Sequence, residues 1–411
     1  MKNNKIKFVI FPALMFFIIL SSCRKNNDTL PTQPLQINLT LKQANLVSSE
    51  NSFAFDVFSR VLSQAGDVNT IISPMSISYA LSMTVNGAAN STRDSILKAL
   101  RVSDTSMADL NKSYRDLTAS LLSVDSRVIM DIANSVWTEK DFSVKAPFAN
   151  TLTSYYDAQA KSFDITDPTV PTQINSWISD RTNGLIKNMI SQLDDNTVML
   201  LINAIYFKGM WKTQFDASAT TSRTFTKPDG STENVPTMYE SENQKVYRGN
   251  GFYVAEIPYG QGNYVMDIIL PDNNDLSAVT SSLTAASLST WTTSLTSSKV
   301  NLYLPKFKYG YNISLHNVLS LMGMGIAFTD AADFSNISDI PLLISKVLHQ
   351  AYIQTDEEGT EAAAATVVVI EPTSVIQSVT IDVNHQFIYL IREVTTNSVI
   401  FMGKVTDPLA Q

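Results

Sequence analysis

The sequence predicts an α+β domain built around a large sheet. Apolar residues between Phe53 and Leu62 recur at spacings of three and four, which indicates an amphipathic helix. The run from Val198 to Tyr206 is nearly continuously apolar, as in a strand covered on both faces. Tyr253–Pro258 and Tyr264–Leu270 flank a glycine-containing turn and predict a hairpin. Helices therefore dominate the first part of the chain, and strands become frequent later.

The remaining elements follow in chain order. Ser73-Pro74 places proline just inside an N-cap serine and opens a second helix, which Asn86-Gly87 ends. We expect further helical pieces at Ile174–Ser179, Leu185–Leu193 and Leu276–Ser298, and strands at Val300–Lys308 and Val399–Val405. No internal repeat or long linker interrupts the chain after Leu46. Residues 46–411 are therefore expected to form one domain.

Composition excludes several classes of protein. The chain has 411 residues, of which 44% are hydrophobic and 17% are charged, so it can bury a large core. Its formal net charge of −8 argues against a nucleic-acid partner, because such proteins are normally basic. A single cysteine excludes an intramolecular disulfide.

The first residues indicate export. Residues 1–22 have three early lysines and the apolar run Phe8–Leu20, as in a secretory signal peptide. Leu20-Ser21-Ser22-Cys23 then resembles the bacterial lipobox, in which Cys23 is acylated; an ordinary signal peptide with a stray cysteine is the alternative. Residues 23–45 are expected to be a flexible tether. A lipid anchor at the bacterial outer membrane or cell surface is expected, and the periplasmic face stays open.

Enzyme chemistry has no support in the sequence. The three histidines, His316, His349 and His385, are 33 and 36 residues apart and belong to no metal-binding motif. A G-x-S-x-G nucleophile elbow is lacking, and the Gly-x-Gly pairs lie in turns or after a helix. We therefore expect no enzymatic activity, no cofactor and no metal.

The segment from Gln354 to Ile381 differs from the rest. An acidic cluster is followed by four alanines and the β-branched run Thr366–Ile370. Alanine favours helix and β-branched residues favour strand, so a helix followed by a strand is one interpretation. Read with period two, Glu361 and Glu371 share one face, and the other face is uncharged, as in a strand with one buried face.

This segment, Glu-Gly-Thr-Glu-Ala-Ala-Ala-Ala-Thr at 358–366, resembles the hinge of the reactive loop of inhibitory serpins. Stretches within 69–88, 174–184, 203–211 and 401–408 resemble other signatures of that family, in family order. The chain is thus identified as a member of the serpin family, similar to bacterial lipoprotein serpins. It departs from the family in having Asn384-His385-Gln386-Phe387 in place of Asp-His-Pro-Phe, and about two extra residues before Phe387.

The resemblance implies a fold and a mechanism. The fold is a large central, mainly antiparallel sheet with second and third sheets, about eight to nine helices, and an exposed reactive-centre loop at about 356–381. The implied function is a suicide substrate that traps serine proteases when its cleaved loop inserts into the central sheet. The alternative is a non-inhibitory serpin that acts as a surface binding or carrier protein. We expect a monomer.

The resemblance also assigns residues. Counting fourteen residues beyond Gly359 places the reactive bond at Thr373–Ser374. The apolar residues around it suit elastase-like or subtilisin-like proteases, with papain-like cysteine proteases as a further class. The alternative bait residues are Val367, Val368, Val369 and Ile370. The hinge comprises Glu358, Gly359, Thr360, Glu361, Ala362, Ala363, Ala364, Ala365 and Thr366. The cluster that controls sheet opening comprises Ser73, Ser76, Asn203, His349 and Trp211.

Overall fold

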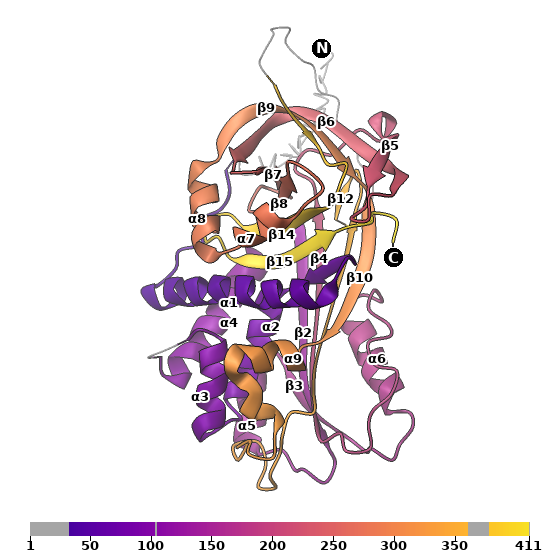
Figure 1. Ribbon diagram of the computed structural model, residues 1–411. Coiled ribbons are helices and arrows are strands. Elements are labelled where there is room, and N and C mark those ends of the chain that lie inside the picture. Colours follow the sequence, from indigo (N-terminus) through magenta and orange to yellow (C-terminus); the bar gives the residue numbers. More distant parts are fainter. Residues whose placement is uncertain (1–32, 103–104, 361–377, 411) are drawn as a thin grey trace, which may run out of the picture. The chain divides into compact units, whose positions relative to one another are not determined.

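The computed structural model describes residues 33–102, 105–360 and 378–410 (Figure 1). The expected signal peptide, Cys23, most of the hinge, the alternative bait and the Thr373–Ser374 bond lie outside these residues. Within the described part of the chain, no helix combines the length and hydrophobicity needed to cross a bilayer.

Nine α-helices occur in the described residues. Thr40 begins the first, because its hydroxyl accepts from the Gln43 N–H while the Gln43 side chain accepts from the Thr40 N–H. Ser73 caps the second, with Pro74 in its first turn. The helices are α1 (Leu41–Ala65), α2 (Pro74–Val85), α3 (Asn90–Ala99), α4 (Met107–Ser123), α5 (Ala146–Tyr156), α6 (Val170–Arg181), α7 (Ser277–Ser281), α8 (Ala285–Ser294) and α9 (His316–Leu319), with short turns η1 (Ala217–Ala219), η2 (Ser320–Met324) and η3 (Gly325–Phe328).

The described strands form two hydrogen-bonded sheets. The six-stranded sheet has the order β10 (Phe307–Ser314), β11 (Lys346–Thr355), β12 (Gly359–Thr360), β4 (Met199–Met210), β2 (Val128–Glu139) and β3 (Gln159–Phe163). The nine-stranded sheet has the order β1 (Thr70–Ile72), β15 (Val399–Val405), β14 (Phe387–Glu393), β8 (Tyr264–Pro271), β7 (Phe252–Pro258), β6 (Thr232–Arg248), β9 (Thr296–Pro305) and β13 (Val379–Asp382), and β5 (Thr221–Thr226) pairs with β6.

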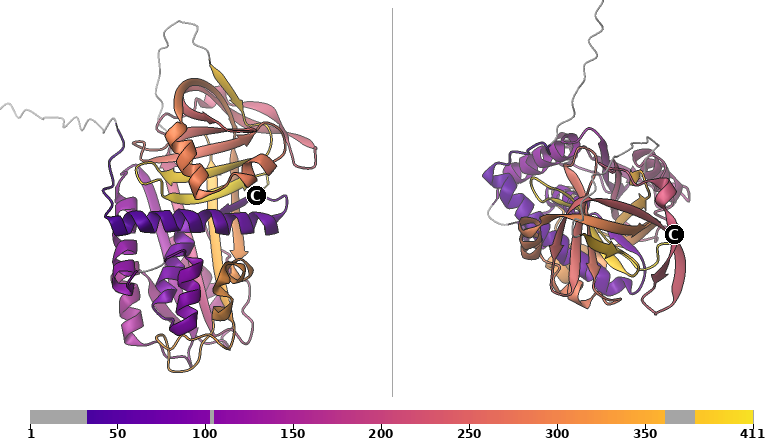
Figure 2. Two further views of the ribbon diagram at one scale, coloured as in Figure 1. Left: turned by 60° about the vertical axis from the view of Figure 1, so that its left-hand side comes forward. Right: turned by 90° about the horizontal axis from the view of Figure 1, so that it is seen from above.

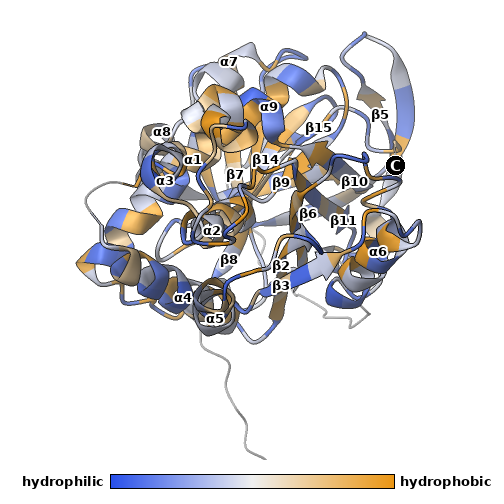
Figure 3. Ribbon diagram, turned by 90° about the horizontal axis from the view of Figure 1, so that it is seen from below, coloured by the Kyte–Doolittle hydropathy of each residue, from blue (hydrophilic) through white to orange (hydrophobic). Residues whose placement is uncertain are grey.

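Different helices cover the two faces of the six-stranded sheet. On its outer face, α6 packs Ile174 and Ile178 with Leu200 and Leu348 of the sheet. On the inner face, alternate residues of the same strands join the main core with α1 to α5 (Figures 1 and 2). Figure 3 shows hydrophilic residues on α3 and α4 at the periphery, as expected of helices with one buried face.

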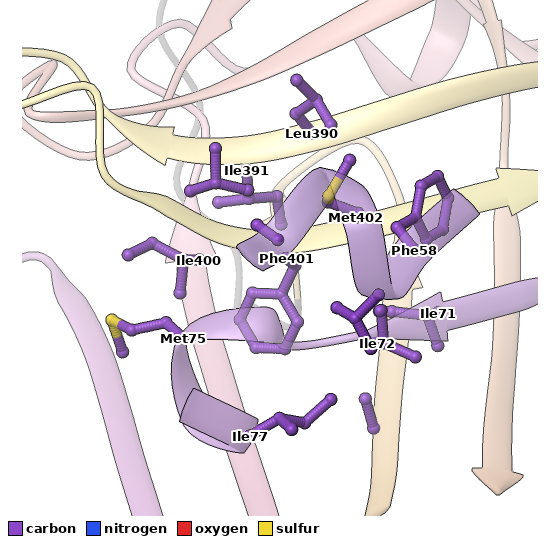
Figure 4. Close-up of a cluster of buried hydrophobic side chains, with 14 of the residues drawn as sticks. Phe58, Ile71, Ile72, Met75, Ile77, Leu390, Ile391, Ile400, Phe401 and Met402 are labelled. Atoms are coloured by element: carbon purple, nitrogen blue, oxygen red, sulfur yellow. The ribbon is translucent and has the colours of Figure 1, made fainter. Parts of the chain in front are cut away.

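The main core fixes the start of α2. Phe401 and Met402 of β15 lie with Ile72, Met75 and Phe58 in one apolar cluster (Figure 4). These side chains are all nearly inaccessible to solvent. Ser73, between Ile72 and the helix, is thereby held in the interior behind the six-stranded sheet.

The fold prediction is confirmed, with four corrections. Leu185–Leu193 is irregular rather than helical, because the Asn175 side chain accepts from the backbone N–H groups of Met189 and Ile190 and donates to the Ile190 carbonyl. That side chain takes the place of helical hydrogen bonds. The expected strand Val300–Lys308 is divided between β9 and β10.

The other two corrections concern the sheets and the tether. The second and third sheets are one hydrogen-bonded network, because the 17-residue strand β6 pairs with β5 and β9 and also with β7. The expected tether ends earlier than residue 45, since α1 begins at Leu41. Leu35 is also held, because its N–H and carbonyl both bond to the Asn263 side chain.

Candidate functional site

The first hinge residues already lie inside the six-stranded sheet. Gly359 and Thr360 form β12, which pairs antiparallel with β4 on one side and with β11 on the other. Beyond β12 the two long strands pair directly and in parallel, from Leu200–Ile205 against Lys346–Ala351. We call this direct contact between β4 and β11 the seam. The sheet is thus open by one strand at the β12 end and closed along the seam.

Gly359 is required by the close fit. Its φ is +149°, and an added Cβ would lie 2.2 Å from the carbonyl oxygen of Gly209. Any side chain would therefore have to push β4 and β12 apart. The glycine lets the chain leave β11 and turn directly into the sheet.

Thr360 faces the interior. Its side chain is buried, and its hydroxyl lies 2.8 Å from the hydroxyl of Tyr259. Because side chains alternate between faces along a strand, Thr360 shows which face of a strand added at this position would point toward the core.

Aromatic side chains pack beside β12 at the open end of the sheet. The ring of Trp211, just after β4, stacks on Tyr259 with centroids 4.3 Å apart. The Trp211 indole donates to the carbonyl of Asp356 at 2.9 Å, and its backbone N–H donates to the carbonyl of Glu358 at 2.9 Å. Trp211 therefore lies where the hinge meets the sheet.

A second set of contacts holds the chain before the hinge. Glu357 accepts from Lys306 at 2.7 Å and from the Thr220 hydroxyl at 2.8 Å, and its carbonyl accepts from the Phe215 N–H. Together with the bonds from Trp211, these contacts fix the three residues that precede Gly359. The hinge therefore starts from a rigid support.

A buried polar cluster crosses the seam behind the closed part of the sheet. His349 of β11 lies opposite Asn203 of β4, and the His349 Nδ1 to Asn203 Oδ1 distance is 2.5 Å. The Asn203 amide donates to the Ser76 carbonyl at 3.0 Å and to the Asn134 side-chain oxygen at 2.6 Å. Ser73 is the fifth member of the cluster and donates from its hydroxyl to the Ile400 carbonyl at 2.7 Å.

His349 is held neutral. The Ser73 backbone N–H donates to Nε2 of His349 at 3.0 Å, so the proton lies on Nδ1 and is donated to Asn203. Burial lowers the pKa of His349 to about 3. The one side-chain hydrogen bond that joins β4 to β11 in this cluster therefore depends on a neutral imidazole.

The structure brings the predicted residues into two groups. Ser73, Ser76, Asn203 and His349 meet in the polar cluster, while Trp211 belongs with the hinge at the open end. Sequence reasoning missed two participants, Asn134 and Tyr259. Asn134 lies in the part of β2 that is buried throughout, from Ala133 to Glu139, and a buried amide of that kind signals a polar partner nearby.

The described residues contain no cluster of three or more His, Cys, Asp or Glu side chains suited to a metal ion. A hollow with a volume of about 620 Å³ lies at the far end of the seam.

Gly359 and Thr360 thus form a short strand between β4 and β11 at the open end of the sheet. Comparisons with known proteins show the family. A family profile described as "Serpin (serine protease inhibitor)" matches residues 48–408. The chain belongs to the serpin family. Many serpins inhibit serine proteases, and some are non-inhibitory.

The relatives include a serine protease inhibitor and a corticosteroid-binding protein. A serine protease inhibitor of Mus musculus is 34% identical over 372 residues, which cover 88% of this chain and 89% of that protein. Corticosteroid-binding globulin of Oryctolagus cuniculus is 32% identical over 369 residues, covering 88% and 96%. The native state of tengpin, a thermophilic serpin, superimposes with a TM-score of 0.83 at 32% identity, covering 91% and 96%.

Proposed function

We propose that this serpin is a suicide-substrate inhibitor of elastase-like or subtilisin-like serine proteases. The observation that carries the proposal is β12, which places the first two residues of the inserting strand between β4 and β11 in the register of an added strand. The hinge beyond it has the small residues that such an insertion needs. A protease that cleaves the loop would be carried along the sheet before its acyl-enzyme is hydrolysed.

The pairing of β12 defines the rest of the path. Thr360 lies opposite Gly209 on β4 and Thr355 on β11, so each later loop residue would meet one residue earlier on both strands. Thr366 would then lie between Asn203 and His349. Its hydroxyl can both donate and accept, so it can replace the hydrogen bond that now joins those two side chains. The path therefore opens the polar cluster without leaving a buried group unpaired.

Cleavage after Thr373 supplies enough chain for this path. Fourteen residues follow Gly359 up to that bond, and at about 3.3 Å per residue they would carry a protease roughly 45 Å. Between Thr366 and Ile381 there is no lysine, arginine or aromatic residue, which suits a shallow apolar pocket. Papain-like cysteine proteases are a further candidate class.

The decisive experiment is a denaturing gel of residues 24–411 mixed with pancreatic elastase or with trypsin. We expect a covalent adduct with elastase, which resists denaturation, and none with trypsin at the Thr373 bond. Cleavage without any adduct from either class would overturn the proposal and favour the carrier function that the name of corticosteroid-binding globulin suggests.

We also propose that acylation of Cys23 anchors the protein to a bacterial membrane. The support is the Leu-Ser-Ser-Cys sequence after an apolar run. Metabolic labelling with a fatty acid should mark the full-length chain and not Cys23→Ser. Labelling of both forms would contradict the assignment.

A further inference from the structure

Three asparagines of the chain, at positions 86, 183 and 250, are followed directly by glycine. Such a pair is chemically labile, because the backbone nitrogen of the glycine can attack the side-chain carbonyl carbon of the asparagine and expel ammonia. Glycine has no Cβ and so permits the backbone geometry that this attack needs. The attack also requires an asparagine side chain that is free to turn and a glycine N–H that is not already hydrogen-bonded. The three pairs differ in both respects.

The first pair is held at both groups. The Asn86 side chain donates to the Ser82 carbonyl at 3.0 Å, and its oxygen accepts from the Asn111 amide at 2.8 Å. The Gly87 N–H donates to the Thr84 carbonyl at 2.9 Å, and Gly87 is buried. The folded protein therefore protects this pair.

The second pair is held at one group. Asn183 is exposed and lies just beyond the end of α6. The Gly184 N–H donates to the Ser179 carbonyl at 2.8 Å, which satisfies one of the last carbonyls of that helix. This hydrogen bond must break before the Gly184 nitrogen can attack.

The third pair is free at both groups. Asn250 and Gly251 form the tip of the hairpin between β6 and β7, and Asn250 is exposed. Among the described residues, neither the Asn250 side chain nor the Gly251 N–H has a hydrogen-bond partner. The backbone bond across this turn runs from the Gly249 N–H to the Phe252 carbonyl at 2.9 Å and leaves the Gly251 nitrogen unused.

The residues around this tip are held in place. The Gly251 carbonyl accepts from the Asp272 N–H at 2.9 Å, and the φ of Gly251 is +85°, which favours glycine. The Arg248 guanidinium donates to both carboxylate oxygens of Asp272, at 2.5 and 2.6 Å. The turn thus presents a free side chain and a free N–H on a fixed base.

We propose that Asn250 is a site of spontaneous modification, at which this serpin deamidates in its folded state. The Gly251 nitrogen bonds to Cγ of Asn250, and its proton leaves with the side-chain amide as ammonia, so that a succinimide forms. Water then opens the ring at either carbonyl and leaves an isoaspartyl or an aspartyl residue. The product carries a new negative charge two residues from Arg248. The inference does not depend on the proposed function.

The test is incubation of folded residues 24–411 at neutral and at alkaline pH, followed by mass spectrometry of the peptides. We expect residue 250 to gain about 1 Da, faster at the higher pH because the attacking nitrogen must lose its proton. Conversion at 183 and at 86 should be slower by about fivefold or more, because a hydrogen bond must first break there. Conversion at 183 or 86 as fast as at 250 would overturn the inference.

Two controls separate the fold from the local sequence. In urea the three pairs should convert at similar rates, and a lack of conversion at 250 in the folded protein alone would overturn the inference. In Asn250→Gln the attack would have to close a six-membered ring, which is slower, so residue 250 should stay unmodified while conversion at 183 is unchanged. Loss of ammonia from the glutamine variant at the wild-type rate would show that the reaction occurs elsewhere.

Discussion

The two ends of the β4 and β11 strands differ in the contacts that hold the two strands together. At the open end, β12 separates the strands, and Trp211 and Tyr259 stack beside it. At the closed end the strands bond to each other directly, and the polar cluster bridges them behind the sheet. At the open end the two strands are therefore already apart, whereas at the closed end they are bonded to each other and resist separation. An inserting strand would extend from one end only.

The backbone pairing at the closed end is also weaker than an antiparallel pairing would be. β4 and β11 are parallel, although most of their other pairings in this sheet are antiparallel. A strand that entered between them would pair antiparallel with both, as β12 does already. Parallel pairs are slightly less stable per residue than antiparallel ones, so the exchange favours insertion. The comparison predicts that changes at the open end decide whether insertion occurs, and changes along the seam decide how readily.

The largest expected effect is at the open end. In Thr360→Arg a cation would occupy the buried position beside Tyr259, at a cost of several kcal/mol unless it finds a partner. We expect the loop to be cleaved by elastase as before while the covalent adduct disappears, as seen on a denaturing gel. Thr360→Ser, which keeps the hydroxyl, should retain the adduct. Undiminished adduct in the arginine variant would contradict the loop-insertion mechanism.

The second prediction tests how far along the seam the strand must travel. Thr373→Arg should recruit trypsin-like proteases with efficient trapping, because cleavage there leaves fourteen residues beyond Gly359. Val368→Arg should recruit them with more turnover, because cleavage leaves only nine and shortens the travel by roughly 16 Å. Mass spectrometry of the peptide released from each adduct would locate the bond. Equal trapping by both variants would contradict the length argument.

Much of this site depends on patterns of neighbouring residues, and such patterns can be recognised in the sequence. The alternation of charge from Thr360 onward predicts which face is buried, and the Tyr259 contact confirms its first residue. Tyr259 itself could not be predicted as the partner. It is brought to Trp211 by an isolated antiparallel bridge between residues nearly 50 positions apart, and only the tertiary fold determines that contact.

Two of the wrong predictions concern segments whose backbone is bonded by a side chain far away in the sequence. Leu185–Leu193 has apolar residues at helical spacing, but Asn175 bonds to the backbone of Met189 and Ile190 and favours an irregular path. Leu35 likewise belongs to a segment whose composition is typical of a tether, yet Asn263 binds its backbone. Hydrogen bonds of this kind, from a side chain far away in the sequence, leave no signal in the local sequence of the segment that they hold.

The third prediction concerns pH and the closed end. His349 has a pKa near 3 in the folded protein and about 6.5 when exposed, so its contribution to stability is complete above pH 6.5 and declines as the pH falls toward 3. Burial raises the pKa of Glu50 to about 7, so its contribution is present below pH 4.5 and is lost as the pH rises through 7.

Because the two effects oppose each other, the informative quantity is a difference. We expect the melting temperature of wild type minus that of His349→Gln to be smaller at pH 5 than at pH 7.5, since glutamine does not titrate. Spontaneous loss of inhibitory activity on incubation should also accelerate at pH 5 in the wild type only. A difference that does not change with pH would mean that the seam does not depend on the charge of His349.

The smallest expected effect lies beside the open end. The Asn263 side chain is buried, donates to the Leu35 carbonyl at 2.7 Å and accepts from the Leu35 N–H at 2.9 Å. Asn263→Ala would remove both bonds and lower the free energy of unfolding by about 1–2 kcal/mol, measured by urea denaturation. Hydrogen exchange should rise at residues 34–38 and hardly at 346–351, because the two lost bonds hold Leu35 and not the seam. Thr395→Val, which removes only the hydroxyl that accepts from the Ile37 N–H, should have a smaller effect in the same direction. Faster exchange along the seam in either variant would show that the two ends are coupled and do not act separately.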